Sequence, residues 1–240
     1  MKKKKNIRDL IYVNGSEYAN NCFYSYGIEF YEFMSSVEHR PENLILLKHK
    51  FDNTQLNLAS RFEYTTTQEI DELIEDDVYG YGDFCWVDFN KEEDLDNLSS
   101  LQIAELLYFG HLAKPLHVIP KHRFAYYAHD DGWFNKIYVS ELLDYELILS
   151  NVMTFKLKKF TRKQITPIPS DISKTLLEIS KEGLFIDFSK MEINKLEIRI
   201  PFTVIGHYMD MDKVYDLKDE ITDYNTWLVQ QNKEWMIINE

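Results

Sequence analysis

The chain has 240 residues, of which 45% are hydrophobic and 15% aromatic, and its formal net charge is −13 at pH 7. A chain of this length and apolar content can bury a substantial core, so we expect a folded globular protein. Its acidity disfavours direct contact with a nucleic-acid backbone, because phosphate contacts need a basic surface. An acidic surface suits a soluble protein, and its more specific interpretation is a nucleic-acid decoy or a partner for a basic protein.

The N-terminus carries consecutive lysines, and residues 1–5 are expected to form a disordered basic tail. The residues that follow lack the apolar region of a signal peptide, and no stretch approaches transmembrane length. The two cysteines, Cys22 and Cys85, show neither a disulfide nor a zinc-binding spacing. These features predict a cytoplasmic protein without a membrane segment.

Glycine and proline are scarce, with eight and six residues, so the chain has little material for a flexible linker. Residues 6–240 are therefore expected to form a single globular domain. A two-lobed arrangement with a connection near residues 161–170 is the alternative.

The first half of the chain alternates between strand and helix patterns. A strand over residues 10–13 leads to Asn14-Gly15, a pair that favours a tight hairpin turn. A short apolar run suggests a buried strand within residues 43–51. A capping box and helical spacing predict a helix over residues 66–76, and aromatic and apolar residues predict a strand over 84–89. A second capping box, Ser99 to Gln102, opens a helix that ends at Gly110.

The second half of the chain predicts a further helix between Pro169 and Gly183, followed by strands over residues 184–188 and 196–204. Apolar residues from Val214 to Leu228 recur at helical spacing and indicate a helix near the C-terminus. Because strands and helices are interspersed without regular βαβ units, the predicted fold is α+β. We expect a mixed, mainly antiparallel sheet with several short helices packed on it.

A hairpin is predicted over residues 123–139, where two aromatic strands flank Asp-Asp-Gly. A two-residue turn at Asp131-Gly132 places His129 opposite Phe134 and keeps Lys136 off the apolar face. A three-residue turn that begins at Asp130 shifts the register by one residue and places Lys136 beside the core. The first register is preferred because it segregates Lys136 from the apolar residues.

The preferred register predicts a polar patch at the hairpin, with an imidazole, His129, that can take up protons near neutral pH. The residues expected to bind a ligand there are Trp133, Tyr127, Lys136 and Asp131. The simpler interpretation is structural, because Asp-Gly suits a turn and Trp133 can anchor the hairpin. The spacing of the histidines in this part of the chain matches no established ligand pattern, so no metal ligands are assigned, and the sequence leaves the cofactor unknown.

A catalytic interpretation places His129 and Asp130 at the centre of an acid/base or metal-assisted hydrolase. Asp88 joins them as a candidate, because a carboxylate inside an apolar strand needs a partner or a raised pKa. It can equally well end the strand and face water.

Three functions remain open from the sequence. The favoured hypothesis is a non-enzymatic module that binds a protein or a small ligand through the aromatic hairpin near residues 123–139. The alternative is the hydrolase centred on His129, Asp130 and Asp88, and the third is the acidic decoy of nucleic acid. No residue pattern indicates the oligomeric state.

Overall fold

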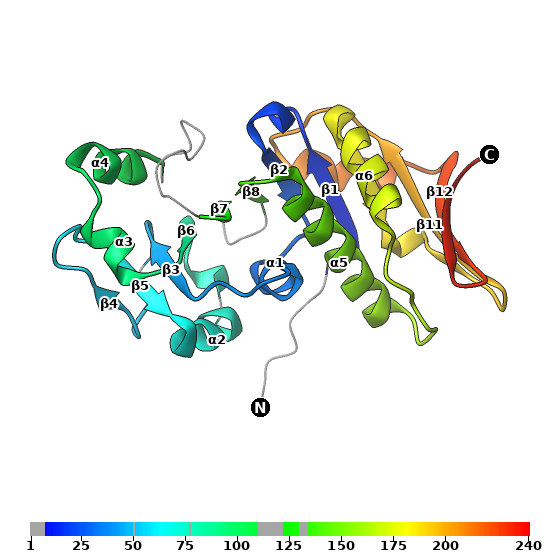
Figure 1. Cartoon of the computed structure of the whole chain (residues 1–240). Coiled ribbons are helices and arrows are strands. Elements are labelled where there is room, and N and C mark those ends of the chain that lie inside the picture. The colour runs from blue at the N-terminus through cyan, green and yellow to red at the C-terminus, as the bar shows by residue number, and fades with distance from the viewer. Residues whose placement is uncertain (1–7, 50, 77, 110–121, 130–133) are drawn as a thin grey trace.

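The structure is a computed structural model of the chain, and it describes residues 8–49, 51–76, 78–109, 122–129 and 134–240. Within these ranges the chain forms a large sheet with helices packed on both of its faces (Figure 1). The strands are β1 Leu10–Asn14, β2 Cys22–Tyr26, β3 Asn43–Leu46, β4 Gln55–Leu56, β5 Glu63–Thr66, β6 Phe84–Phe89, β7 Phe124–His129, β8 Phe134–Val139, β9 Leu184–Asp187, β10 Glu192–Ile193, β11 Glu197–Val204, β12 Thr226–Gln231 and β13 Glu234–Asn239.

All the strand pairs found in the sheet are antiparallel. The strand order is β13-β12-β11-β9-β1-β2-β8-β7-β6-β3-β5-β4, and β10 pairs with β11 beside this path. Hairpin β7–β8 therefore lies inside the sheet, between β6 and β2, and β13 and β4 lie at its two ends. The expected α+β fold with an antiparallel sheet is confirmed.

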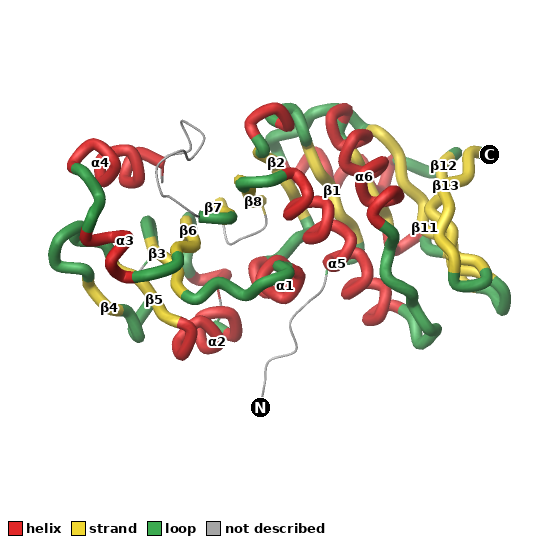
Figure 2. The backbone as a smooth tube through the Cα atoms, viewed as in Figure 1, coloured by secondary structure: helices red, strands yellow, loops and turns green. Residues whose placement is uncertain are grey.

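The helices of the described residues are α1 Phe30–Ser36, α2 Thr67–Glu75, α3 Glu92–Asp96, α4 Ser100–Phe109, α5 Leu142–Phe160, α6 Ser170–Ile179 and α7 Met211–Glu220. Figure 2 shows these helices in red along the yellow strands, with α5 and α6 side by side and the shorter α1 between them and α2. Helices α5 and α6 are connected by residues 161–169.

Three apolar clusters hold the helices to the sheet. The largest packs α1, α2, α5 and α6 against one face, and it includes Phe33, Leu73 and Leu149. On the other face, α3 and α4 cover β3, β6, β7 and β8 through Leu95 and Leu106, and α7 covers β1, β2 and β9 in a separate cluster. Helices on both faces explain why most sheet strands are buried on both sides.

The structure confirms most of the elements expected from the sequence, including the helix that begins after the Ser99 capping box. There the Ser99 backbone N–H donates to the Gln102 side chain at 2.8 Å, and the Gln102 N–H donates to the Ser99 hydroxyl at 3.3 Å. His129 pairs with Phe134, so the preferred hairpin register is correct.

Two local predictions are wrong. Strands β1 and β2 form a hairpin, but Asn14 belongs to β1 and its side chain accepts the Ser16 N–H at 2.9 Å, so residues 15–21 form a longer connection. The C-terminal helix ends at Glu220, and Leu228 belongs to strand β12. The spacing of Leu228 from Val214 fits a helix, but pairing of β12 with β11 and β13 determines its conformation.

Candidate functional site

The negative charge of the protein is concentrated in one part of the chain, residues 52–105, which we call the acidic region. It contains fifteen aspartates and glutamates against two basic residues and so carries −13, whereas the rest of the chain has 25 residues of each sign. The acidic region comprises β4, β5, β6, helices α2 and α3, and the first part of α4. These elements lie together at the left end of the sheet in Figure 1, so the charge is segregated in space as well as in sequence.

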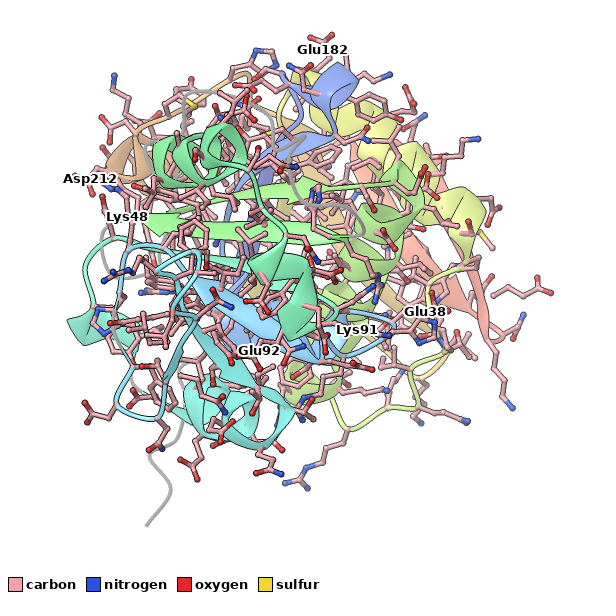
Figure 3. All side chains as sticks on the ribbon, turned by 60° about the vertical axis from the view of Figure 1, so that its left-hand side comes forward. Glu38, Lys48, Lys91, Glu92, Glu182 and Asp212 are labelled. Carbon is pink, nitrogen blue, oxygen red and sulfur yellow. The ribbon has the colours of Figure 1, made fainter. Side chains whose placement is uncertain are left out.

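The carboxylates of the acidic region are displayed on its short helices. Helix α2 buries Ile70 and Leu73, and α3 buries Leu95, so the polar faces of both helices point outward. The exposed acidic residues of these two helices are Asp71, Glu72, Glu75, Glu92, Glu93 and Asp96. Figure 3 shows Glu92 at the start of α3, far from Glu182 at the top of that view.

Large apolar side chains also lie exposed in and beside the acidic region. Leu58 is 79% exposed and Leu101 is 68% exposed, and Leu56 and Leu107 are more than half exposed. A single exposed leucine needs no explanation, but apolar side chains among carboxylates supply contact area for a partner with both basic and apolar groups.

At the edge of the acidic region, an aspartate and a histidine face each other across two strands. β6 pairs with β7 in a register that aligns Phe84 with Ala128, and extending it by one residue places Asp83 opposite His129. Asp83 Oδ1 lies 2.5 Å from His129 Nδ1. The His129 side chain is 59% exposed and that of Asp83 is 36% exposed, so this pair is open to solvent.

Two further side chains converge on the Asp83 carboxylate. The Tyr127 hydroxyl donates to Asp83 Oδ2 at 2.9 Å, and Lys48 Nζ lies 3.5 Å from the same oxygen. Lys48 also lies over the Tyr127 ring, 5.1 Å from its centroid. Burial and the hydrogen bond to Asp83 raise the pKa of Tyr127, so its hydroxyl is a donor at neutral pH. We call Lys48, Asp83, Tyr127 and His129 the His129 cluster.

The hydrogen bonds of the His129 cluster determine what its imidazole can do. An ionised carboxylate only accepts hydrogen bonds, so Nδ1 of His129 carries the proton that points to Asp83. The lone pair of the neutral ring therefore lies on Nε2, the ring nitrogen that does not contact Asp83. This arrangement orients the imidazole to accept a proton or a hydrogen bond from a bound group.

Asp88 lies away from His129. It sits at the far end of β6, and one of its oxygens, Oδ1, accepts the backbone N–H groups of Arg123 and Phe124 at 2.7 and 2.8 Å. Strand alternation places Asp88 on the face of Trp86, opposite to the face of Tyr127. Burial raises the pKa of Asp88 to about 6, against the lowering effect of its backbone donors. The structure thus does not bring His129 and Asp88 together, and it gives Asp88 a structural role at the start of β7.

The second face of hairpin β7–β8 is closed, which differs from the open polar patch expected there. Tyr127 is 4% exposed and Lys136 is 3% exposed, because this face packs in the cluster covered by α3 and α4. The Lys136 ammonium lies 4.7 Å from the centroid of the Tyr24 ring and 3.6 Å from the Glu17 carboxylate. These contacts stabilise a buried cation within the protein.

Asp130, Asp131 and Trp133 lie outside the described residues, so their expected roles stay predictions. In the described part of the chain, no three side chains among His, Cys, Asp and Glu converge to hold a metal ion. A hollow beside the start of β7 is lined by Arg123, Phe124, Val139, Asp144, Ile148 and neighbouring residues.

Asp83 and Lys48 are the members of the His129 cluster that reasoning from the sequence missed. Both lie in connections just beyond strand ends, 45 residues or more before His129 in the chain. Asp83 directly precedes a strand that the sequence predicted correctly. The missing information was that β6 pairs with β7, because this pairing alone brings Asp83 to His129.

No protein-family model matches this chain, and searches of curated proteins and of solved structures found no match either. Among the described residues, no helix combines the length and the apolar content that crossing a bilayer requires.

Proposed function

We propose that this protein is a non-enzymatic interaction module that binds a basic protein partner through its acidic region. The observation that carries the proposal is that residues 52–105 hold a charge equal to that of the whole chain. Six of the region's fifteen carboxylates lie exposed on α2 and α3, while the rest of the chain has balanced charge. A surface of one sign attracts a partner of the other sign and speeds its association.

The exposed leucines supply the contacts that charge alone does not. Charged rims contribute mainly to the rate and specificity of association, whereas buried apolar anchors contribute most of the affinity. Leu58 and Leu101 are the most exposed apolar residues of the acidic region. Hairpin β7–β8 contributes the exposed His129 at the edge of this surface, so the hairpin takes part through this residue.

The test is affinity capture from cells with two variants that remove equal charge. The first variant neutralises four exposed carboxylates of the acidic region by Glu72→Gln, Glu75→Gln, Glu92→Gln and Glu93→Gln. The matched control neutralises four exposed carboxylates elsewhere by Glu182→Gln, Asp216→Asn, Asp219→Asn and Glu220→Gln. Circular dichroism and thermal unfolding verify that both variants are folded.

We expect wild type and control to retain a protein of basic isoelectric point that the acidic-region variant loses. Leu58→Ser and Leu101→Ser should weaken capture of the same protein without changing the charge. If wild type, the acidic-region variant and the control capture the same proteins in the same amounts, the acidic region is not the binding surface.

The nucleic-acid decoy is a narrower version of this proposal, because the partner of a decoy is a basic protein that binds nucleic acid. Competition with added nucleic acid distinguishes a decoy from a module whose partner has a separate binding surface. A decoy's partner is released by duplex DNA or RNA in proportion to the added nucleic acid, whereas a partner with a separate binding surface is retained.

Acid/base hydrolysis is the second candidate function, and the Asp83–His129 contact of 2.5 Å favours it. An imidazole whose Nδ1–H is held by a carboxylate can act through Nε2 as a general base toward water. In this version Asp83 replaces Asp130 and Asp88 as the carboxylate partner of His129.

Hydrolysis of p-nitrophenyl acetate and p-nitrophenyl phosphate tests this candidate. His129→Asn and Asp83→Asn should each lower the rate by tenfold or more, by analogy with the loss of a general base. His207→Asn removes another exposed imidazole and is the matched control. Equal rates for the three variants would show that any hydrolysis does not depend on the Asp83–His129 pair.

A further inference from the structure

Strand β13 ends the sheet with a row of backbone groups that face away from β12. The backbone N–H of Glu240 donates to Asn225 at 2.8 Å, which places residue 240 in a hydrogen-bonded pair. Antiparallel pairing alternates along the strand, so the N–H and C=O groups of Trp235, Ile237 and Asn239 point outward. No hydrogen bond from the described residues to these outward groups is found.

The β13 edge lacks most of the features that normally prevent edge pairing. Its sequence, Glu-Trp-Met-Ile-Ile-Asn, contains no proline and no lysine, and its four central residues are apolar. Met236 is 36% exposed and lies on the face of the sheet opposite to Trp235, which is buried. At the other end of the sheet, β4 has only two residues, so the long unprotected edge is β13.

The distribution of charge favours a second copy of the chain as the occupant of this edge. The acidic region begins at β6, eight strand spacings from β13, or about 40 Å along the sheet. Salt screens charges over about 8 Å at physiological ionic strength. Two copies joined at β13 therefore meet through the part of the chain with balanced charge and keep their acidic regions at opposite ends.

We propose that two copies of this protein dimerise by antiparallel pairing of β13 with β13, which joins their sheets across a two-fold axis. The register that fits best is centred on Met236, with Trp235 opposite Ile237 of the second copy. A register centred on Ile237 would place Glu234 opposite Glu240 of the second copy, and like charges opposite each other are unfavourable.

Charge substitutions at Met236 test this pairing by sedimentation velocity over a concentration series. In the proposed register Met236 faces Met236 of the second copy, so Met236→Lys and Met236→Glu each bring like charges together. Each variant alone should dimerise roughly tenfold more weakly than wild type or worse. Mixing the two variants should restore dimers, because each lysine then faces a glutamate.

The equal mixture is the control for folding, since a variant that had lost its fold could not form the mixed dimer. Leu143→Lys, on an exposed leucine of α5, is the control for added charge and should leave the dimer unchanged. A monomeric wild type, or dimers that persist in both single variants, would overturn the proposal. A mixture that stays monomeric would overturn it as well.

Discussion

At the scale of single residues, the two candidate aspartates of the central strands have different roles. Asp83 holds the exposed His129 ring, and Asp88 holds two backbone N–H groups in the interior. The sequence identified Asp88 as a carboxylate in an apolar strand and His129 as the histidine of interest. It could not assign their partners, because these come from strand pairing between segments about 35 to 45 residues apart.

Substitution of Asp88 should change how stability depends on pH. Its folded-state pKa of about 6 lies above the ordinary aspartate value, so the native state binds more protons between about pH 4 and pH 6. The contribution of this group to stability is fully present below about pH 4 and is lost as the pH rises through 6. The loss amounts to as much as about 3 kcal/mol.

Asp88→Asn should remove this pH-dependent loss, because asparagine is neutral but its carbonyl oxygen can still accept the N–H groups of Arg123 and Phe124. Urea unfolding of wild type and Asp88→Asn at pH 4 and pH 7 measures how much the free energy of unfolding changes between the two pH values. Asp88→Ala is the contrasting variant and should be less stable than Asp88→Asn by about 1–3 kcal/mol at both pH values, because it leaves two buried donors without an acceptor. A wild-type pH dependence retained by Asp88→Asn would contradict this account.

At the scale of elements, helix α5 shows where the sequence pattern fails. No pattern in the sequence indicated this 19-residue helix, although it is the longest among the described residues. Ten of its residues are buried, including Tyr145, Ser150 and Lys156, so it lacks the regular alternation of apolar and polar faces by which amphipathic helices are recognised. Helix α2, with one apolar stripe, was predicted almost to the residue.

The Glu32–Lys156 ion pair joins α1 to α5 inside the protein, with both side chains 0% exposed and 2.9 Å between Oε1 and Nζ. Burial raises the pKa of Glu32 and lowers that of Lys156. Lys156→Met should cost about 3–5 kcal/mol, because it leaves a buried carboxylate without its counter-ion.

The double variant Glu32→Gln with Lys156→Met separates the charge from the packing. Glutamine can still accept the Glu29 N–H, which Glu32 now accepts at 3.0 Å. The double variant should therefore be more stable than Lys156→Met alone in urea unfolding. Equal or lower stability of the double variant would mean that the lysine stabilises the helices by packing alone.

Gly183 lies in a turn whose position the sequence predicted, and the structure explains why the turn requires glycine at this position. Its φ is +86°, and a Cβ atom there would lie 1.8 Å from the carbonyl oxygen of Gly206. Gly183→Ala should cost at least about 1–3 kcal/mol in thermal or urea unfolding. Gly80→Ala is the matched control and should be nearly neutral, since a Cβ at Gly80 meets no atom within 4 Å.

At the scale of the whole molecule, the fold places the acidic region and the β13 edge at opposite ends of the sheet. The α+β class and the antiparallel sheet could be predicted from composition and local patterns. The strand order could not, because it joins β1 to β9 and β2 to β8 across more than 100 residues. That order places the acidic region at one end of the sheet and the apolar edge β13 at the other, which gives the molecule two distinct surfaces.

The segregated charge predicts that binding to the proposed basic partner depends on salt. Exposed charges are screened as ionic strength rises, so affinity should fall steadily from low to high salt. Association rates measured by stopped flow or surface plasmon resonance should fall more than dissociation rates rise, because charge steers the encounter. If salt changed only the dissociation rate and left the association rate unchanged, long-range attraction by the acidic region would not be the cause of the salt dependence.

The affinity of the captured basic protein for three forms of this chain tests the central claim most directly. These forms are wild type, the acidic-region variant with four carboxylates neutralised on α2 and α3, and the control with four neutralised elsewhere. The account predicts that the acidic-region variant binds tenfold or more weakly and loses much of the salt dependence, while the control matches wild type. Equal affinity and equal salt dependence for all three forms would contradict it.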